Sequence, residues 1–229
     1  MTMRQYSVRH GSAGAPRQNV ELQVLNRGGK RRGLRLGRVL RPLLRLPLAA
    51  GLAVLWACQA EQQFSTKYAC SFVYYASYHP NSALTLALGN AGHYCIVAPK
   101  VVGGVTHLAM TPNIGSWTTE QTDVAMVTAI ENERLSYDNM GANRRLIVGL
   151  SNFNGLKAFD GQCPYCLDKG SSPNRPLAWT DKGQMLECAN CKTKYNPNAD
   201  GVPVNGNEET PRLIEYRADY NGERLYVHN

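Results

Sequence analysis

The chain has 229 residues, of which 25 are Lys or Arg, 17 are Asp or Glu and seven are Cys, and its formal net charge is +8. This length suits one ordinary domain with a smaller addition. Residues 1–57 contain eleven of the basic residues and one acid, Glu21, so residues 58–229 carry a net charge of −2. Nucleic-acid binding needs a concentrated positive surface that displaces counterions, and we therefore expect no nucleic-acid partner.

The first 57 residues have the organisation of a targeting segment. The basic run NRGGKRRGLRLGRVLRPLLR ends at Arg45, and the twelve residues LPLAAGLAVLWA follow without a charge. A helix needs about 20 apolar residues to cross a hydrocarbon core of about 30 Å, so this run has the length of a signal-peptide apolar region. With Ala57 before Cys58, the segment resembles a bacterial lipoprotein signal, in which that cysteine is lipidated. The alternatives are a cleaved signal without lipid, or a short membrane-anchoring or buried helix.

A polar stretch separates this leader from the part that can fold. QAEQQFSTK, at 59–67, lacks hydrophobic periodicity, which is typical of a linker. We therefore divide the chain into a leader at 1–57, a lipid-anchored tether at 58–67 and a folded domain at 68–229. This division places the protein in the bacterial cell envelope, bound to the membrane through its N-terminal lipid.

The beginning of the folded domain predicts strands with one short helix. CSFVYYASY, at 70–78, is rich in aromatic and β-branched residues, which favour strands. NSALTLALGN, with Asn81 as the cap and Gly89 near its end, predicts a short helix. Residues 93–111 predict a hairpin, because Gly103-Gly104 supplies the positive φ of a tight primed turn.

The later part of the domain continues this pattern. TEQTDVAMVTAIENERL, at 119–135, predicts a short helix or a loop, since its apolar residues are three apart but β-branched. RLIVGLSNFNGLKAFDG predicts a second hairpin with its turn at Asn154-Gly155, and LIEYRADYNGERLYVHN a third with its turn at Asn221-Gly222. Several short strands and little helix indicate an antiparallel β domain.

Four of the seven cysteines form two C-x-x-C pairs. Cys163 and Cys166 enclose Pro-Tyr, and after 21 residues Cys188 and Cys191 enclose Ala-Asn. This spacing lies at the edge of the range that is typical of four-thiolate metal sites. In such sites each tight turn directs two sulfurs at one ion, and two turns complete a tetrahedron. Four thiolates leave no open position for water or substrate, so the site would be structural or electron-carrying. Two disulfides in an oxidising compartment are the alternative.

The CPYC sequence also occurs in dithiol redox proteins such as glutaredoxins. There the first cysteine stands at the start of a helix, which lowers its pKa. In this chain Gly170, Pro173 and Pro176 exclude a helix after Cys166, which disfavours dithiol catalysis.

Two further cysteines, Cys70 and Cys95, lie in strand-like runs. In an oxidising envelope they could pair in a disulfide, although a free cysteine is also a common buried apolar residue.

The segments around the four cysteines resemble a Rieske-type ferredoxin domain. FDGQCPYC, MLECANC, KTKYNPNADGVPVNG and PRLIEYRADYNGERLYVHN follow one another as that family's two ligand loops, Gly-rich turn and closing hairpin do. The resemblance covers residues 145–229, and the strands at 68–112 could complete the architecture. The matching residues outside the ligand loops are Tyr195, Gly201, Pro203, Leu213, Tyr216, Gly222 and Leu225.

The ligand set departs from that family. A Rieske cluster binds one iron through two His, whereas Cys166 and Cys191 stand at those positions and none of the five His lies in the motif. The resemblance therefore implies a small antiparallel β-sandwich or barrel that is Rieske-like, with a four-cysteine subdomain of two C-x-x-C loops at 160–200. Thiolates suit zinc, our first choice, then mononuclear rubredoxin-like iron, then an all-Cys [2Fe–2S] cluster.

Two functions follow from this sequence. The first is a non-enzymatic envelope lipoprotein with structural zinc. The second is an electron carrier with iron at the same four cysteines and a redox or envelope protein as partner. No phosphate-binding Gly-rich loop, G-x-S-x-G or H-E-x-x-H motif is present.

Overall fold

An eight-stranded antiparallel sheet forms the larger part of the computed structural model, which describes residues 64–115, 121–134, 137–170 and 174–229. The order of its strands is β1 (Ser71–Tyr75), β12 (Arg224–His228), β11 (Glu215–Tyr220), β6 (Leu156–Asp160), β5 (Leu146–Leu150), β2 (His93–Val102), β3 (Val105–Pro112) and β4 (Asp123–Ala125). The predicted leader, Cys58 and most of the tether lie outside the described residues.

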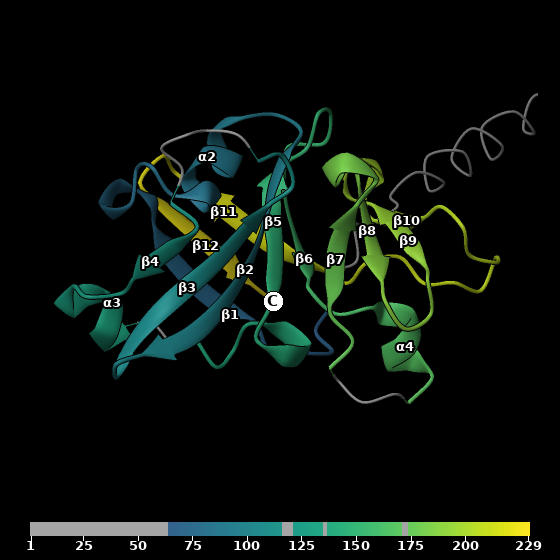
Figure 1. Cartoon of the computed structure of the whole chain (residues 1–229), viewed down its shortest axis with the longest axis horizontal. Coiled ribbons are helices and arrows are strands. Elements are labelled where there is room, and N and C mark those ends of the chain that lie inside the picture. The colour runs from purple at the N-terminus through teal and green to yellow at the C-terminus, as the bar shows by residue number, and fades with distance from the viewer. Residues whose placement is uncertain (1–63, 116–120, 135–136, 171–173) are drawn as a thin grey trace, which may run out of the picture. The chain divides into compact units, whose positions relative to one another are not determined.

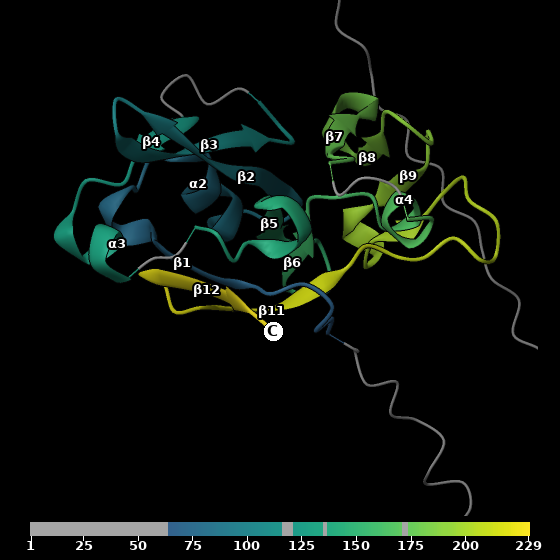
Figure 2. The same cartoon turned by 90° about the horizontal axis from the view of Figure 1, so that it is seen from below.

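The sheet curls into a half-barrel around the helix α2 (Ala83–Gly89). In Figure 2, β2, β3 and β4 lie on one side of α2 and β1, β11 and β12 on the other, with β5 and β6 between them. The helix buries Ala83, Leu84, Ala87 and Leu88, whose spacing places them on one face. The main core therefore lies inside the half-barrel, and the predicted mainly antiparallel β fold is confirmed.

The predicted helix near residue 81 is confirmed, but its cap is one residue later than predicted. Ser82, not Asn81, is the N-cap, and its hydroxyl accepts a hydrogen bond from the Thr85 backbone N–H at 3.1 Å. Serine and asparagine cap helices about equally well, so the sequence around Asn81 does not distinguish them.

The three predicted hairpins are present. Val102 pairs with Val105 across Gly103-Gly104, whose φ angles are 58° and 83°. The other two turns are longer than predicted, because Leu150 pairs with Leu156 and Tyr220 with Leu225. The segment at 119–135 contains α3 (Ala129–Arg134) and also the strand β4, which was not predicted.

A second, four-stranded sheet lies beside the half-barrel (Figure 1). Its order is β10 (Val202–Pro203), β9 (Lys194–Asn196), β8 (Met185–Cys188) and β7 (Leu177–Thr180). With the helix α4 (Pro164–Asp168) it forms the segment 161–214, which we call the cysteine lobe. The lobe is inserted between β6 and β11, which are hydrogen-bonded neighbours in the large sheet.

The helix α4 corrects one prediction. The helix is five residues long and extends two residues beyond Cys166, although Gly170 and the prolines were expected to exclude one. Proline at the first helical position is favourable, so Pro164 starts the helix and Gly170, with a φ of 71°, follows its end.

A second apolar cluster joins the lobe to the half-barrel. It combines Tyr94, Ile96, Ile147 and Phe159 of the large sheet with buried lobe residues such as Leu177. Two hydrogen bonds cross the same boundary, from Tyr94 OH to the Pro197 carbonyl at 3.0 Å and from Trp179 Nε1 to the Thr111 carbonyl at 2.9 Å. In the part of the chain that is described, no helix is long and apolar enough to cross a membrane.

The remaining short elements within the described ranges are four 3₁₀ turns. They are η2 (Ala76–Tyr78), η3 (Gly141–Asn143), η4 (Asp181–Gly183) and η5 (Pro197–Ala199).

Candidate metal centre

The first pair of cysteines is positioned by the start of α4. Cys163 is the N-cap residue, and its carbonyl accepts the Leu167 N–H at 3.1 Å. Its own N–H donates to the Arg175 carbonyl at 2.9 Å, which ties the loop to the strand that follows. Residues three apart lie on one side of a helical turn, so Cys163 and Cys166 present their sulfurs to the same side.

The second pair is positioned by a tight turn at the end of β8. The Lys192 N–H donates to the Cys188 carbonyl at 2.9 Å, and the Cys188 N–H donates to the Thr193 carbonyl at 3.0 Å. Lys192 has a left-handed φ of 62°, which reverses the chain after Cys191. The turn therefore brings the sulfurs of Cys188 and Cys191 together.

The four sulfurs converge on one point. All of the Sγ atoms of Cys163, Cys166, Cys188 and Cys191 lie within 4.8 Å of one another. The pair from Cys163 to Cys191 is 3.6 Å apart, and the pair from Cys166 to Cys188 is 3.8 Å apart. Four sulfurs at about 2.3 Å from one tetrahedral ion would be about 3.8 Å from each other. The predicted four-cysteine cluster is confirmed, and its donor set fits one thiolate-bound ion.

Polar groups surround the sulfurs. The Asn190 side-chain amide donates to Cys166 Sγ at 3.4 Å, and Thr193 Oγ1 lies 3.2 Å from Cys191 Sγ. The Tyr195 hydroxyl lies 3.6 Å from Cys163 Sγ and is fully buried. Hydrogen bonds to ligand sulfurs orient them and tune the bound metal. The sequence indicated Tyr195 through the family resemblance, whereas Asn190 and Thr193 were missed although both lie in or beside a C-x-x-C pair.

The electrostatics of the four thiols differ along the cluster. Burial raises the pKa of Cys163 and of Cys166. Burial also acts to raise the pKa of Cys191, but hydrogen bonds from Thr193 and from the neighbouring thiols outweigh it and lower this pKa to about 7. Thiols in such a site bind a cation by releasing their protons, so hydrogen bonding favours this release at Cys191, whereas burial opposes it at Cys163 and Cys166.

Three of the four cysteines of the site are buried. Cys163, Cys166 and Cys188 are buried, while Cys191 is partly exposed. The cluster therefore meets the surface at Cys191.

The geometry argues against a catalytic dithiol at CPYC. An attacking cysteine needs a lowered pKa, whereas burial shifts the pKa of Cys163 upward. The sulfur of Cys163 also lies close to Cys191 of the other loop. No disulfide joins any of the four among the described residues, so the alternative of two disulfides is not formed either.

The remaining cysteines do not take part in the cluster. Cys70 and Cys95 are buried thiols, and no disulfide joins them in the described chain. Cys70 directly precedes β1, whereas Cys95 lies in β2, and β12, β11, β6 and β5 separate these strands in the sheet order. The Cys70 sulfur instead donates to the Val227 carbonyl at 3.7 Å. The disulfide that the sequence left open is thus not formed in the described chain, and the predicted lipidation at Cys58 lies outside the described residues.

Comparison with known proteins gives no relative: no family model, no curated protein and no solved structure matches the chain. The Rieske resemblance therefore stays a prediction from the sequence.

Proposed function

We propose that this protein is a non-enzymatic, lipid-anchored protein of the bacterial envelope whose cysteine lobe is held in its fold by one structural zinc ion. The observation that carries the proposal is the set of four sulfurs within 4.8 Å of one another. Four protein thiolates fill a tetrahedral coordination sphere, so no position is left for a reacting water or substrate.

The spacing of the sulfurs favours a single ion. In an all-Cys two-iron cluster the four thiolates are divided between two irons, which requires larger separations between the two pairs than this chain has. The lobe also gains from a structural ion, since β9 and β10 have only three and two residues. Structural zinc contributes an apparent ~10–16 kcal/mol to folding in small zinc peptides.

The envelope location is supported by the sequence alone. The basic run, the twelve uncharged residues and Cys58 have the order of a lipoprotein signal. Growth with radiolabelled palmitate tests it: we expect label in the full chain and none in the Cys58→Ala variant. Label in both, or in neither, contradicts lipidation at this residue.

We also propose that the scaffold is Rieske-like with exchanged ligands. Two features of the chain support this relation. A strand, β6, leads directly into the first ligand loop, and the second loop follows another strand, β8. The ligand-bearing lobe is inserted between two neighbouring strands of a larger antiparallel sheet.

A second candidate is an electron carrier with mononuclear iron at the same four cysteines, serving a redox partner in the envelope. Two observations favour it. Cys191 is partly exposed, so an electron can be transferred to a partner at this ligand. The Asn190 amide donates a hydrogen bond to Cys166 Sγ. Hydrogen bonds to ligand sulfurs help to set the reduction potential of iron–thiolate sites.

Metal analysis with a visible spectrum distinguishes the two candidates. The full chain, purified in detergent without added metal, is expected to be colourless and to contain about one equivalent of zinc. Red or brown protein whose visible absorption bleaches on reduction supports the iron carrier. Cys188→Ala should remove the metal, and Cys70→Ala, which alters a buried thiol outside the cluster, should retain it. Metal-free wild-type protein would overturn both candidates.

A further inference from the structure

A polar cavity of about 610 Å³ lies at the end of the small sheet opposite to the cysteines. Strand β8 connects the two places, because Met185 lines the cavity and Cys188, about 10 Å along the strand, belongs to the metal centre. The cavity is thus separate from the four thiolates. Its size falls within the range of about 300–1,000 Å³ for small-molecule sites.

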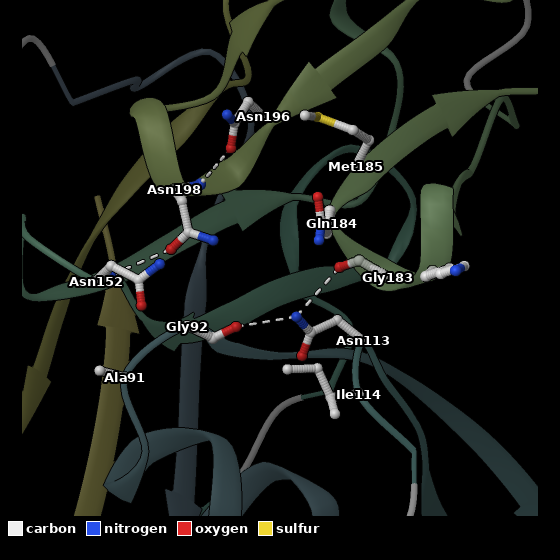
Figure 3. A pocket seen from close by; sticks show the side chains of 11 residues that line it. Ala91, Gly92, Asn113, Ile114, Asn152, Gly183, Gln184, Met185, Asn196 and Asn198 are labelled. Carbon is white, nitrogen blue, oxygen red and sulfur yellow. Dashed lines mark hydrogen bonds between the residues drawn. The ribbon is translucent and has the colours of Figure 1, made fainter. Parts of the chain in front are cut away.

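The walls of the cavity come from loops that are far apart in the sequence. Ala91-Gly92, Asn113 and Asn152 belong to the half-barrel, and 182–185, Asn196 and Asn198 belong to the cysteine lobe. We call this site the amide pocket, because side-chain amides dominate it (Figure 3).

Two of the amides hold the walls together. The Asn113 side chain accepts from the Tyr94 N–H at 2.8 Å. It also donates to the carbonyls of Gly92 and Gly183, at 3.0 and 3.2 Å. Asn198 Oδ1 accepts from the Asn152 N–H at 3.2 Å. These bonds join the barrel wall to the lobe wall, so the pocket is preformed.

The lobe wall has a strained backbone. Asp181, Lys182 and Gly183 have consecutive φ angles of 49°, 57° and 82°. Left-handed conformations at residues other than glycine cost on the order of 1–3 kcal/mol each and gather at binding and catalytic sites. The turn directs 182–184 toward the cavity instead of continuing the strand.

Other amides in the pocket have open hydrogen-bonding groups. Among the described residues, no hydrogen bond engages the side chain of Asn152 or of Gln184. The Oδ1 atoms of Asn196 and Asn198 accept backbone N–H groups, which leaves their NH₂ groups open. Figure 3 shows the side chains of Asn152, Asn198 and Gln184 around the same space.

The position of Gly92 leaves room for one of these amides. Its φ is 77°, and a Cβ at this position would lie 2.7 Å from Asn152 Oδ1. Any larger residue would displace the Asn152 side chain, so the glycine allows it to line the pocket.

We propose that the amide pocket binds a neutral saccharide of about one to three units. An amide offers a donor and an acceptor side by side, which matches two neighbouring hydroxyls of a sugar ring. Ile114 and Met185 supply apolar surface for the C–H face of such a ring. Lys182 is the one charged side chain among the described residues that line the cavity, and the other polar side chains there are uncharged amides, which suits a neutral ligand.

The lining of the amide pocket does not suit an extended peptide. Extended peptides are bound by adding a strand to a sheet edge, and the pocket is lined mostly by turns and loops. The observations therefore favour the sugar.

Calorimetric titration of the full-length, metal-loaded protein tests this assignment with three trisaccharides: maltotriose, cellotriose and chitotriose. At least one should bind with a dissociation constant of about 1 mM or lower. Asn152→Ala and Gln184→Ala should each weaken that binding by about tenfold, since each removes two hydrogen-bonding groups. Both side chains are exposed and have no hydrogen bond in the described chain, so the variants should keep the wild-type melting temperature.

Gln121→Ala, which removes another exposed glutamine outside the pocket, is the matched control and should bind as the wild type does. The proposal is overturned when none of the three sugars binds at about 1 mM, or when both pocket variants bind the sugar like the wild type. It is equally overturned when trialanine, and no sugar, is bound.

Discussion

Lys157→Met tests whether a buried ion triad joins the cysteine lobe to the half-barrel. Lys157 Nζ of β6 lies 2.9 Å from Asp200 Oδ1 of the lobe and 3.0 Å from Glu215 Oε1 of β11. The lysine side chain is 3% exposed, against 35% for Asp200 and 16% for Glu215. Methionine has a similar length, so the substitution removes the charge with little change in volume.

The expected loss of stability follows from the burial of Lys157. Removing one partner of a buried ion pair costs about 3–5 kcal/mol, because a charge stays behind without compensation. Asp200 is one-third exposed and also accepts from Asn154 Nδ2, so water and this amide reduce the penalty. We expect a loss of about 3 kcal/mol, which corresponds to a fall of about 6–12 °C in Tm for a domain of this size.

The assay is thermal and urea unfolding of the metal-loaded protein, with Lys100→Met as the control. Lys100 also pairs with a carboxylate, Asp123, but both side chains are more than 40% exposed, and such pairs contribute less than about 1 kcal/mol. A Lys157→Met loss as small as that of the control would refute the reasoning.

The ion pair between Lys157 and Asp200 also predicts that the stability depends on pH. Burial acts to raise the pKa of Asp200, but hydrogen bonds from Lys157 and Asn154 outweigh it and hold this pKa below its ordinary value. A lowered folded pKa gives stability that is present above an unfolded pKa of about 3.9 and is lost as the pH falls through the folded pKa. The stability difference between wild type and Lys157→Met should therefore be smaller at pH 3 than at pH 7. Acid also releases a thiolate-bound metal, and Asp200 lies in the lobe that the metal holds, so the comparison is made only at pH values at which metal analysis shows both proteins still loaded.

Three further predictions concern the lobe. Chelation of the metal should abolish hydrogen-exchange protection in residues 161–214 and leave the eight-stranded sheet protected, since the main core inside the half-barrel contains no buried residue of the lobe; loss of protection throughout would contradict this. Asn190→Ala should weaken metal binding by about tenfold in a chelator competition, and an unchanged affinity would remove its role at Cys166. Gly183→Ala should cost more stability in urea unfolding than Gly104→Ala: both have φ near 80°, but a Cβ at 183 would lie 1.7 Å from the Asn113 carbonyl oxygen and one at 104 meets open space. Equal losses of stability would mean that the close approach of Gly183 to the Asn113 carbonyl does not affect the stability.

The sequence predicted the features that local chemistry determines. The Gly103-Gly104 turn was predictable because positive φ is nearly restricted to glycine. The four cysteines were predictable because each C-x-x-C turn forms its half of the site from adjacent residues. Tight turns and metal loops of this kind need little information from the rest of the chain.

Other features depend on tertiary contacts and were missed. The strands β9 and β10 have three and two residues, which is too short for a hydrophobic period. Asn113, Asn152 and Asn198 come together only because the lobe packs beside the half-barrel, and nothing in their own neighbourhoods marks them. The sequence left open whether Cys70 and Cys95 pair for the same reason, since the curvature of the sheet decides which residues face each other across it.

The insertion point of the cysteine lobe has a consequence for how such a protein can be altered. The chain leaves the half-barrel after Asp160 and returns before Glu215, and the Asp160 N–H donates to the Ile214 carbonyl at 2.8 Å. Entry and exit are thus adjacent, and a turn of about two to five residues spans such a gap between antiparallel strands. Excising 161–214 and closing the gap with a short glycine-rich turn should leave a β body that folds without metal, onto which a different ligand-bearing insert could be grafted.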